Sequence, residues 1–346
     1  MRESYKPVAV WLFMCASAVF LMALIGAVTR LTESGLSIVE WKPVAGALPP
    51  LSHGDWQKEF TLYKSSPQYL KVNKGLSLED FKKIYFWEWL HRLWGRLIGF
   101  MYFIPFILFT VRKRLPKESM PAFYGILGLG FAQGGVGWYM VKSGLVDMPA
   151  VSHYRLAAHL MMAFLIYACL FRTGLSFALR PTREAVRLAP VRGLVTRTLL
   201  VAVITMTWGA FVAGLRAGLL YNTFPMMDGH WLPPELFQHK PMWKAFFEEP
   251  ATVQFIHRVL AALTFIHVIF LYLRSRAFNP PPRLRYLLRA LAITACVQVS
   301  LGILTLLSQV DIILAVCHQA GALTLLTLLL WLLYEIPHDY TVKGRK

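Results

Sequence analysis

The chain has 346 residues, of which 56% are hydrophobic, 14% aromatic and only 16% charged. This composition excludes an intrinsically disordered protein, and the apolar residues come in blocks of about 20 separated by charged stretches, which a soluble core does not need. The 36 Lys and Arg residues outnumber the 18 Asp and Glu residues and give a formal charge of +18. Because the basic residues gather in particular loops, we attribute them to membrane topology and anionic lipid rather than to nucleic-acid binding.

Eight apolar blocks are long enough to cross a membrane as helices, which predicts an all-α integral membrane protein. In chain order they are Val8–Val28, Trp87–Val111, Met120–Val141, Arg155–Leu179, Val195–Leu215, Val253–Tyr272, Leu287–Leu307 and Ile312–Leu333. The first block carries no charge and is too long for the apolar region of a cleaved signal peptide. No Arg- and Ser-rich transit peptide precedes it, which favours a bacterial inner membrane over import into an organelle.

Lys and Arg residues concentrate at both chain ends and in the even-numbered loops. Five arginines lie between residues 180 and 197, and another five between residues 274 and 289. Short basic loops stay on the cytoplasmic side of a membrane. We therefore expect both termini to be cytoplasmic and the odd-numbered loops to be outside.

The first outer loop, residues 29–88, is long enough to fold over the outer surface. It contains no cysteine, because all four cysteines lie in apolar blocks: Cys15, Cys169, Cys296 and Cys317. No disulfide framework is predicted, and we expect these thiols to be small buried side chains.

The two halves of the chain share short motifs in the same order. The segment beginning Gly26-Ala27 aligns without a gap with the segment beginning Gly209-Ala210, and both end in Gly-Leu at residues 35–36 and 218–219. Two further pairs follow: His91-Arg92 with His257-Arg258, and Gln133-x-x-x-Gly137 with Gln298-x-x-x-Gly302. We interpret this as a duplication of four spans, giving halves at residues 1–180 and 181–346. Both halves begin inside, so the repeat is parallel and its axis runs along the membrane normal.

Four histidines occupy equivalent places in the even-numbered spans. Each lies within the first two turns of a span that runs from outside to inside: His91, His159, His257 and His318. At about 1.5 Å of rise per residue, the four rings lie at a similar depth near the outer surface. Polar side chains inside a membrane are costly and usually functional. His267 lies deeper and on another helix face, so we expect a structural role for it.

The residue four positions after each of these histidines is small, namely Gly95, Ala163, Ala261 and Ala322. Positions i and i+4 share a helix face, so a flat ligand could approach each ring, although small residues also suit ordinary helix packing. Imidazole ligates haem iron axially, and two pairs would hold two haems. Zinc or copper is the alternative, but the spans lack the further carboxylates and the outer loops lack the cysteines that usually complete such sites.

Glu88 lies one helical turn before His91, at the predicted membrane border. A carboxylate also suits a helix start for electrostatic reasons. The matching position in the second half is Gln254, which suggests that the first half does chemistry and the second holds a fixed cofactor. Several arginines near the outer face could pair with haem propionates or with lipid headgroups: Arg30, Arg92, Arg96, Arg216 and Arg258.

Four motifs together resemble those of haem A synthase, and the resemblance covers essentially the whole chain. They are Gly26-Ala-Val-Thr-Arg-Leu-Thr-Glu-Ser-Gly-Leu-Ser, Glu40-Trp-Lys-Pro-Val-Ala-Gly-Ala-Leu-Pro-Pro, Glu88-x-x-His91-Arg92 with Gly95-Arg96, and Tyr221-Asn-Thr-Phe-Pro-Met-Met-Asp-Gly. Some members of that family carry a cysteine pair in the first outer loop. This chain has none, and so resembles the subgroup without the pair, which includes mitochondrial relatives.

The resemblance implies a fold of eight transmembrane helices in two pseudo-symmetric four-helix bundles. It implies oxidation of the C8 methyl of haem O to the formyl group of haem A, which haem-copper terminal oxidases require. The resemblance also implies that His257 and His318 ligate a resident haem b in residues 181–346. His91 and His159 would bind substrate haem O in residues 1–180. Glu88 would be the essential acid, as proton acceptor or as stabiliser of a carbocation.

The partners implied are haem O, haem O synthase, an unidentified electron acceptor and membrane lipid; a homo-oligomer stays open, and no nucleic acid is expected. The main alternative is a di-haem b-type electron carrier resembling quinol oxidoreductases. Such a carrier would place its haems at two depths, whereas these four histidines share one. A haem transporter is a third interpretation. It would need a pathway for haem through the protein, rather than a carboxylate beside one ligand.

Overall fold

The computed structural model describes residues 5–40, 45–144 and 150–337. Within them the chain forms helices and turns without a β-strand, and one isolated bridge joins Met227 to His230. The basic residues nearest the chain ends, such as Arg2 and Lys343, lie outside the described residues.

Eight helices are 23 residues or longer, and they run along each of the predicted spans. They are α1 (Lys6–Leu31), α4 (Leu78–Val111), α5 (Met120–Gly144), α6 (His153–Ala178), α7 (Arg192–Gly214), α9 (Pro250–Arg276), α10 (Pro282–Leu307) and α11 (Ile312–Glu335). The short helices are α2 (His53–Lys64), α3 (Pro67–Lys71) and α8 (Met242–Glu248), with 3-10 turns η2 (Ala45–Ala47), η3 (Lys117–Ser119), η4 (Arg183–Val191) and η5 (Ala217–Leu219).

Among the described residues, seven helices are long and apolar enough to cross a membrane, which makes this a multi-pass membrane protein. The helix outside this set is α5, although its 25 residues are long enough. Its sequence contains Gln133 and several glycines, which add no apolar side chain. Seven of the eight predicted spans therefore meet the requirement of length and hydropathy, and α5 meets only that of length.

The described chain divides into two compact units. One consists of residues 14–166, and the other of residues 1–13 together with residues 167–346. The helices α1 and α6 each run from one unit into the other.

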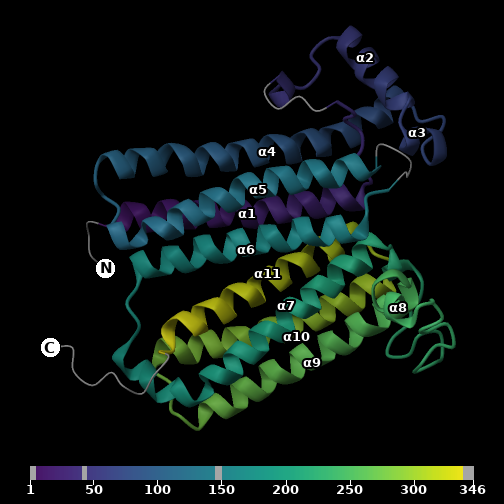
Figure 1. Cartoon of the computed structure of the whole chain (residues 1–346). Coiled ribbons are helices and arrows are strands. Elements are labelled where there is room, and N and C mark those ends of the chain that lie inside the picture. The colour runs from purple at the N-terminus through teal and green to yellow at the C-terminus, as the bar shows by residue number, and fades with distance from the viewer. Residues whose placement is uncertain (1–4, 41–44, 145–149, 338–346) are drawn as a thin grey trace. The chain divides into compact units, whose positions relative to one another are not determined.

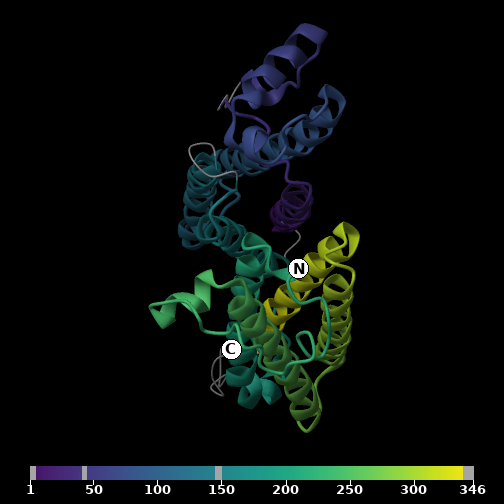
Figure 2. The ribbon, with the colours of Figure 1, turned by 90° about the vertical axis from the view of Figure 1, so that its right-hand side faces the viewer.

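In the unit of residues 14–166, α4 lies alongside α1, where the Trp94 indole donates a hydrogen bond to the Ala18 carbonyl at 2.9 Å. The helix α4 begins at Leu78, well before the predicted span at Trp87, because Ser77 caps it and accepts a hydrogen bond from the Asp80 amide. Helices α2 and α3 lie at this end of α4 (Figure 1, Figure 2).

Part of the segment between α1 and α4 folds into an aromatic lobe, which we define as Ile38, α2, α3 and the first two turns of α4. Its core is a cluster of buried side chains: Ile38, Phe60, Tyr63, Phe81 and Tyr85. Phe60 and Phe81 pack with ring centroids 5.0 Å apart, and Tyr63 and Phe81 at 5.1 Å. Burial of these rings supplies a core for a loop that has no disulfide.

In the other unit, α7, α9, α10 and α11 pack around buried aliphatic residues such as Val195, Val268, Leu291 and Leu329 (Figure 1). The helix α7 ends at Gly214, and two residues later Arg216 has the left-handed φ of 54°. In the sequence alignment Arg216 matches Glu33, which follows α1 and has φ 55°. Both aligned segments therefore turn in the same way after their first helix.

Candidate functional site

The second-half histidines are oriented by the helices that precede them. The Nδ1 atom of His257, on α9, lies 3.2 Å from the Thr205 carbonyl of α7, and Nδ1 of His318, on α11, lies 3.2 Å from the Gln298 carbonyl of α10. A carbonyl can only accept, so each hydrogen bond requires a proton on Nδ1 and leaves the lone pair on Nε2. This is the arrangement in which an imidazole binds a metal through Nε2.

All four candidate histidines pack against a glycine of the preceding long helix. A Cβ atom added to Gly137 or Gly302 would lie 2.8 Å from Cε1 of His159 or His318. At Gly209 the distance to Cε1 of His257 would be 3.1 Å, and at Gly26 the distance to Nε2 of His91 would be 3.4 Å. At Gly137 and Gly302 a side chain would overlap the ring and at Gly209 it would crowd the ring, whereas at Gly26 a Cβ atom would make ordinary contact.

The first-half pair is held differently from the second-half pair. The Gln133 amide donates to the His159 carbonyl at 3.1 Å and lies 3.4 Å from Nε2 of the same residue. The Nδ1 atom of His159 is buried without a hydrogen-bond partner among the described residues. His159 therefore lacks the bond from Nδ1 to a carbonyl that orients both second-half rings.

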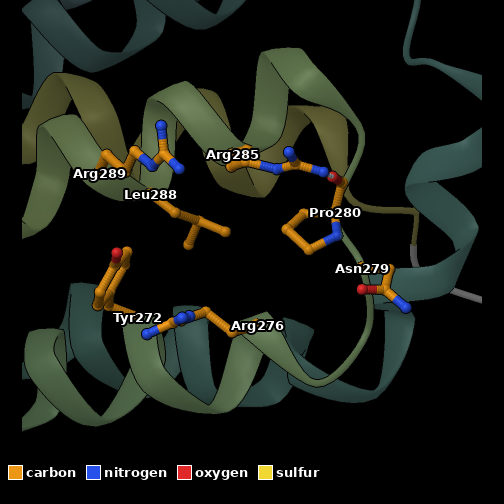
Figure 3. A pocket seen from close by; sticks show the side chains of 7 residues that line it. All are labelled: Tyr272, Arg276, Asn279, Pro280, Arg285, Leu288 and Arg289. Atoms are coloured by element: carbon orange, nitrogen blue, oxygen red, sulfur yellow. Dashed lines mark hydrogen bonds between the residues drawn. The ribbon is translucent and has the colours of Figure 1, made fainter.

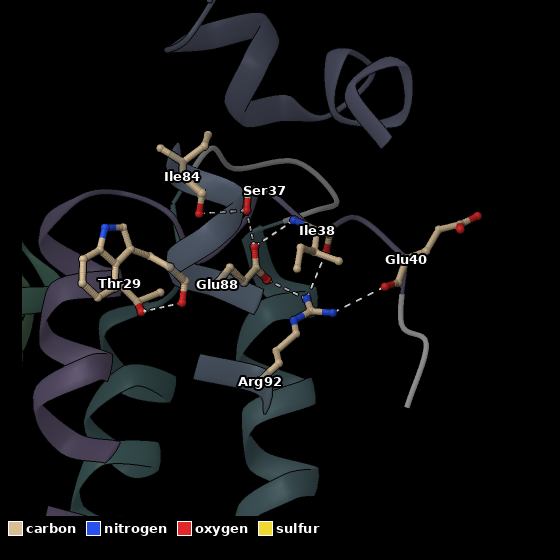
Figure 4. Close-up of polar contacts among 8 residues, drawn as sticks. Thr29, Ser37, Ile38, Glu40, Ile84, Glu88 and Arg92 are labelled. Atoms are coloured by element: carbon tan, nitrogen blue, oxygen red, sulfur yellow. Dashed lines mark hydrogen bonds and ion pairs between the residues drawn. The ribbon is translucent and has the colours of Figure 1, made fainter. Parts of the chain in front are cut away.

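Glu88 is 2% exposed and accepts hydrogen bonds on both carboxylate oxygens (Figure 4). Oε2 accepts from the Ser37 hydroxyl at 2.7 Å and from the Ile38 amide at 2.8 Å. Oε1 pairs with the Arg92 guanidinium at 2.6 Å, and Arg92 also donates to the Ile38 carbonyl at 3.0 Å. The carboxylate is therefore a fixed anion that ties the segment after α1 to the helix carrying His91.

The second half has a matching connection without the charge. Gln254 donates from its amide to the Ala217 carbonyl at 3.0 Å, and Arg258 donates to the carbonyls of Tyr221 at 2.9 Å and Thr223 at 3.0 Å. Arg92 and Arg258 thus both hold the segments between helices through backbone carbonyls. The first half uses an anion where the second half uses a neutral amide.

These donor sets fit haem better than a metal ion held by side chains alone. In the described part of the chain no group of three or more His, Cys, Asp and Glu residues could hold an ion. His257 and His318 lie within electrostatic reach of each other, as do His91 and His159. In the pair His257 and His318, two imidazoles with free Nε2 atoms beside glycine surfaces suit ligation of haem iron.

Each predicted site residue lies on a long helix, but the glycines that receive the four rings were not predicted. The signal was present, since Gly26 aligns with Gly209 and Gly137 with Gly302 in the sequence repeat. His267, as expected, bonds its own helix, with Nδ1 2.8 Å from the Leu263 carbonyl.

The prediction that all four cysteines are buried is wrong for two of them. Cys15 is buried and Cys169 partly so, whereas Cys296 and Cys317 are exposed on the protein surface. Apolar spans of a membrane protein can leave small residues on an outer helix face, because the surrounding lipid is itself apolar.

Comparison with known proteins identifies the relatives of this chain. The profile of a family described as cytochrome oxidase assembly protein matches residues 9–330. A haem A synthase of Nitrosospira multiformis is 51% identical over 96% of this chain and 94% of its own length, and one of Rhodospirillum centenum is 51% identical over 97% and 91%. A haem A synthase of Arabidopsis thaliana is 46% identical over 95% of this chain and 74% of its own length.

Proposed function

This chain belongs to the cytochrome oxidase assembly protein family, and we propose that it is a haem A synthase. It oxidises the C8 methyl group of haem O to the formyl group of haem A, for use by haem-copper terminal oxidases. One observation carries this proposal most strongly: both halves have a histidine pair beside glycines, but only the first has a buried carboxylate one turn before its histidine.

His257 and His318 would hold a resident haem b. Their support comes from the two bonds between Nδ1 and helix carbonyls, which fix the rings and leave Nε2 free. A haem held in this way supplies reversible one-electron chemistry. Gly209 and Gly302 give each ring the room that this orientation requires.

His91 and His159 bind the substrate haem O in the first half. Because His159 lacks the orienting bond on Nδ1, this pair is held less firmly than the other, as suits a molecule that must enter and leave. Glu88 contributes a fixed negative charge near the outer end of α4, where it stabilises positive charge that develops at the reacting methyl carbon. Arg92, Ser37 and Ile38 keep the carboxylate in place.

The wider architecture follows from the same proposal. Helix α5 crosses the membrane as the eighth span, and the halves at residues 1–180 and 181–346 form pseudo-symmetric four-helix bundles. From the basic loops we expect both termini on the cytoplasmic side of a bacterial inner membrane. Haem O synthase supplies the substrate, and an electron acceptor removes the electrons that oxidation of the methyl group releases.

Co-expression with haem O synthase tests this function. Haem extracted from the cells is separated by chromatography and identified by mass, with Glu88→Ala as the inactive variant and Gln254→Ala as its second-half control. We expect haem A from the wild type and from the control, and haem O from Glu88→Ala. If wild-type cells convert no haem O while the purified protein holds two b-type haems, the chain is an electron carrier instead.

A further inference from the structure

A basic cavity lies between α9 and α10, at the opposite end of α9 from His257. Its volume is about 310 Å³. Figure 3 shows Tyr272 and Arg276 of α9 on one side and Arg285, Leu288 and Arg289 of α10 on the other. The 19 residues from His257 to Arg276 correspond to about 28 Å along a helix, so this cavity is separate from the histidine site.

Three guanidinium groups line this cavity, and no acidic residue does. In the part of the chain that the structure describes, none of the three pairs with a carboxylate; the nearby Glu335 accepts instead from Arg283 at 3.0 Å. Arg285 donates to the Pro280 carbonyl at 3.2 Å, which holds its guanidinium at the cavity edge. Like charges this close repel one another, and an anion among them would remove that repulsion while accepting several charge-assisted hydrogen bonds.

The surfaces next to the cavity are apolar and exposed. On α10, Ile293 and Val297 follow Arg289 at intervals of four residues and are 64% and 50% exposed. On α9, Leu273 precedes Arg276 by three residues and is 54% exposed. A ligand that fills the cavity and also covers these side chains must have an anionic head and apolar tails.

We propose that this cavity binds the phosphate group of an anionic phospholipid, with the acyl chains lying along α9 and α10. Basic pockets at the ends of transmembrane helices recognise such headgroups through charge and hydrogen bonding. Arginine suits this task because its planar fork binds two phosphate oxygens at once. The inference rests on the membrane location of the helices and is independent of the enzyme activity.

Lipid retention by the full-length protein tests the site. The protein is reconstituted in bilayers of phosphatidylcholine with phosphatidylglycerol, extracted in mild detergent and examined by native mass spectrometry for bound phosphatidylglycerol. Each of Arg276→Gln and Arg289→Gln should lower retention about fivefold, since one basic residue near a membrane contributes about 1 kcal/mol. Arg274→Gln is the matched control, because Arg274 lies at the same helix end but stacks on Phe278 outside the cavity.

A second arm separates a lipid from a free anion. Inorganic phosphate is added as competitor, and Ile293→Ser is compared with the wild type. We expect Ile293→Ser to weaken phosphatidylglycerol binding and phosphate to displace it poorly. Equal binding of inorganic phosphate, unchanged retention in the two arginine variants, or an equal loss in Arg274→Gln would each overturn the proposal.

Discussion

At the scale of single residues, the site depends on its glycines as much as on its polar side chains. Each of the four histidine rings rests on a glycine of a neighbouring helix, at distances that leave no room for a methyl group at Gly137 and Gly302. Glycine in a helix interior is otherwise unfavourable by roughly 0.5–1 kcal/mol relative to alanine. These glycines are therefore best explained by the imidazoles that they accommodate.

Gly302→Ala should displace the His318 ring, because the new Cβ atom would lie 2.8 Å from Cε1. We expect the variant to lose most of its second-half haem, measured as haem per folded protein and as the low-spin absorption spectrum. Gly193→Ala is the control, since nothing lies within 4 Å of the position its Cβ would take. Unchanged haem content and spectrum in Gly302→Ala would show that this contact does not position the ligand.

Glu88→Ala removes one partner of a buried ion pair, and such a change typically costs about 3–5 kcal/mol. We expect haem A formation to stop while the haem at His257 and His318 stays bound. Glu88→Gln keeps the shape and loses the charge, so it should also be inactive but better folded. Wild-type amounts of haem A from Glu88→Gln, measured by chromatography, would limit Glu88 to holding the loop.

At the scale of elements, the aromatic lobe turns the first outer loop into a folded cap on α4. Its stability comes from buried rings, with Phe81 and Tyr63 fully buried at the centre of the cluster. Ile38 belongs to the core of the lobe, and its amide and the neighbouring Ser37 hydroxyl donate to Glu88. Packing in the lobe is thereby connected to the position of the carboxylate.

Phe81→Ala should destabilise the lobe by about 3–5 kcal/mol, the usual cost of removing a buried aromatic ring. Limited proteolysis of the first outer loop measures this change. Phe86→Ala is the matched control on the same helix, because Phe86 is 47% exposed. Equal protease resistance of both variants would mean that the lobe does not depend on its aromatic core.

The Tyr63 phenol gives the lobe a dependence on alkaline pH. Burial raises the pKa of Tyr63, while its hydroxyl bonds Gln68 at 3.1 Å and Asn73 at 2.8 Å. The unfolded chain ionises near pH 10 and the folded lobe only above it, so this stability is complete below about pH 10 and falls as pH rises further. Loop proteolysis should therefore increase above about pH 10, less so in Tyr63→Phe; identical profiles would contradict this linkage.

Much of the fold could be predicted because apolar length and charge mark membrane helices directly. The starts of α10 and α4 show the limit: the structure begins them at Pro282 and Leu78, before the predicted Leu287 and Trp87, since helices continue beyond the apolar part. Glu88 and the four histidines could be found from spacing. The contacts of their side chains with glycines and loop carbonyls could not, because the repeat shows which glycines recur but not which side chain of another helix each one contacts.

At the scale of the whole molecule, the two halves of the sequence repeat differ in their polar chemistry. The second half has rings fixed by carbonyls and a neutral Gln254, whereas the first has His159 without a hydrogen bond on Nδ1 and the anion Glu88. This difference is what we expect if one site keeps its haem and the other releases it. The sequence repeat predicts pseudo-symmetric bundles, and that arrangement stays a prediction.

The central claim is that the first-half histidines bind substrate haem O and the second-half histidines bind haem b. The identity of the haem in four histidine variants tests it most directly. Purified His91→Ala, His159→Ala, His257→Ala and His318→Ala proteins, produced with haem O synthase, are extracted and their haems identified by chromatography and mass. We predict that the first two retain haem b but form no haem A, and that the last two lose haem b, since one remaining imidazole cannot complete a bis-histidine site. Full haem b in His257→Ala and His318→Ala, or its loss only in His91→Ala and His159→Ala, would contradict the assignment of the two halves.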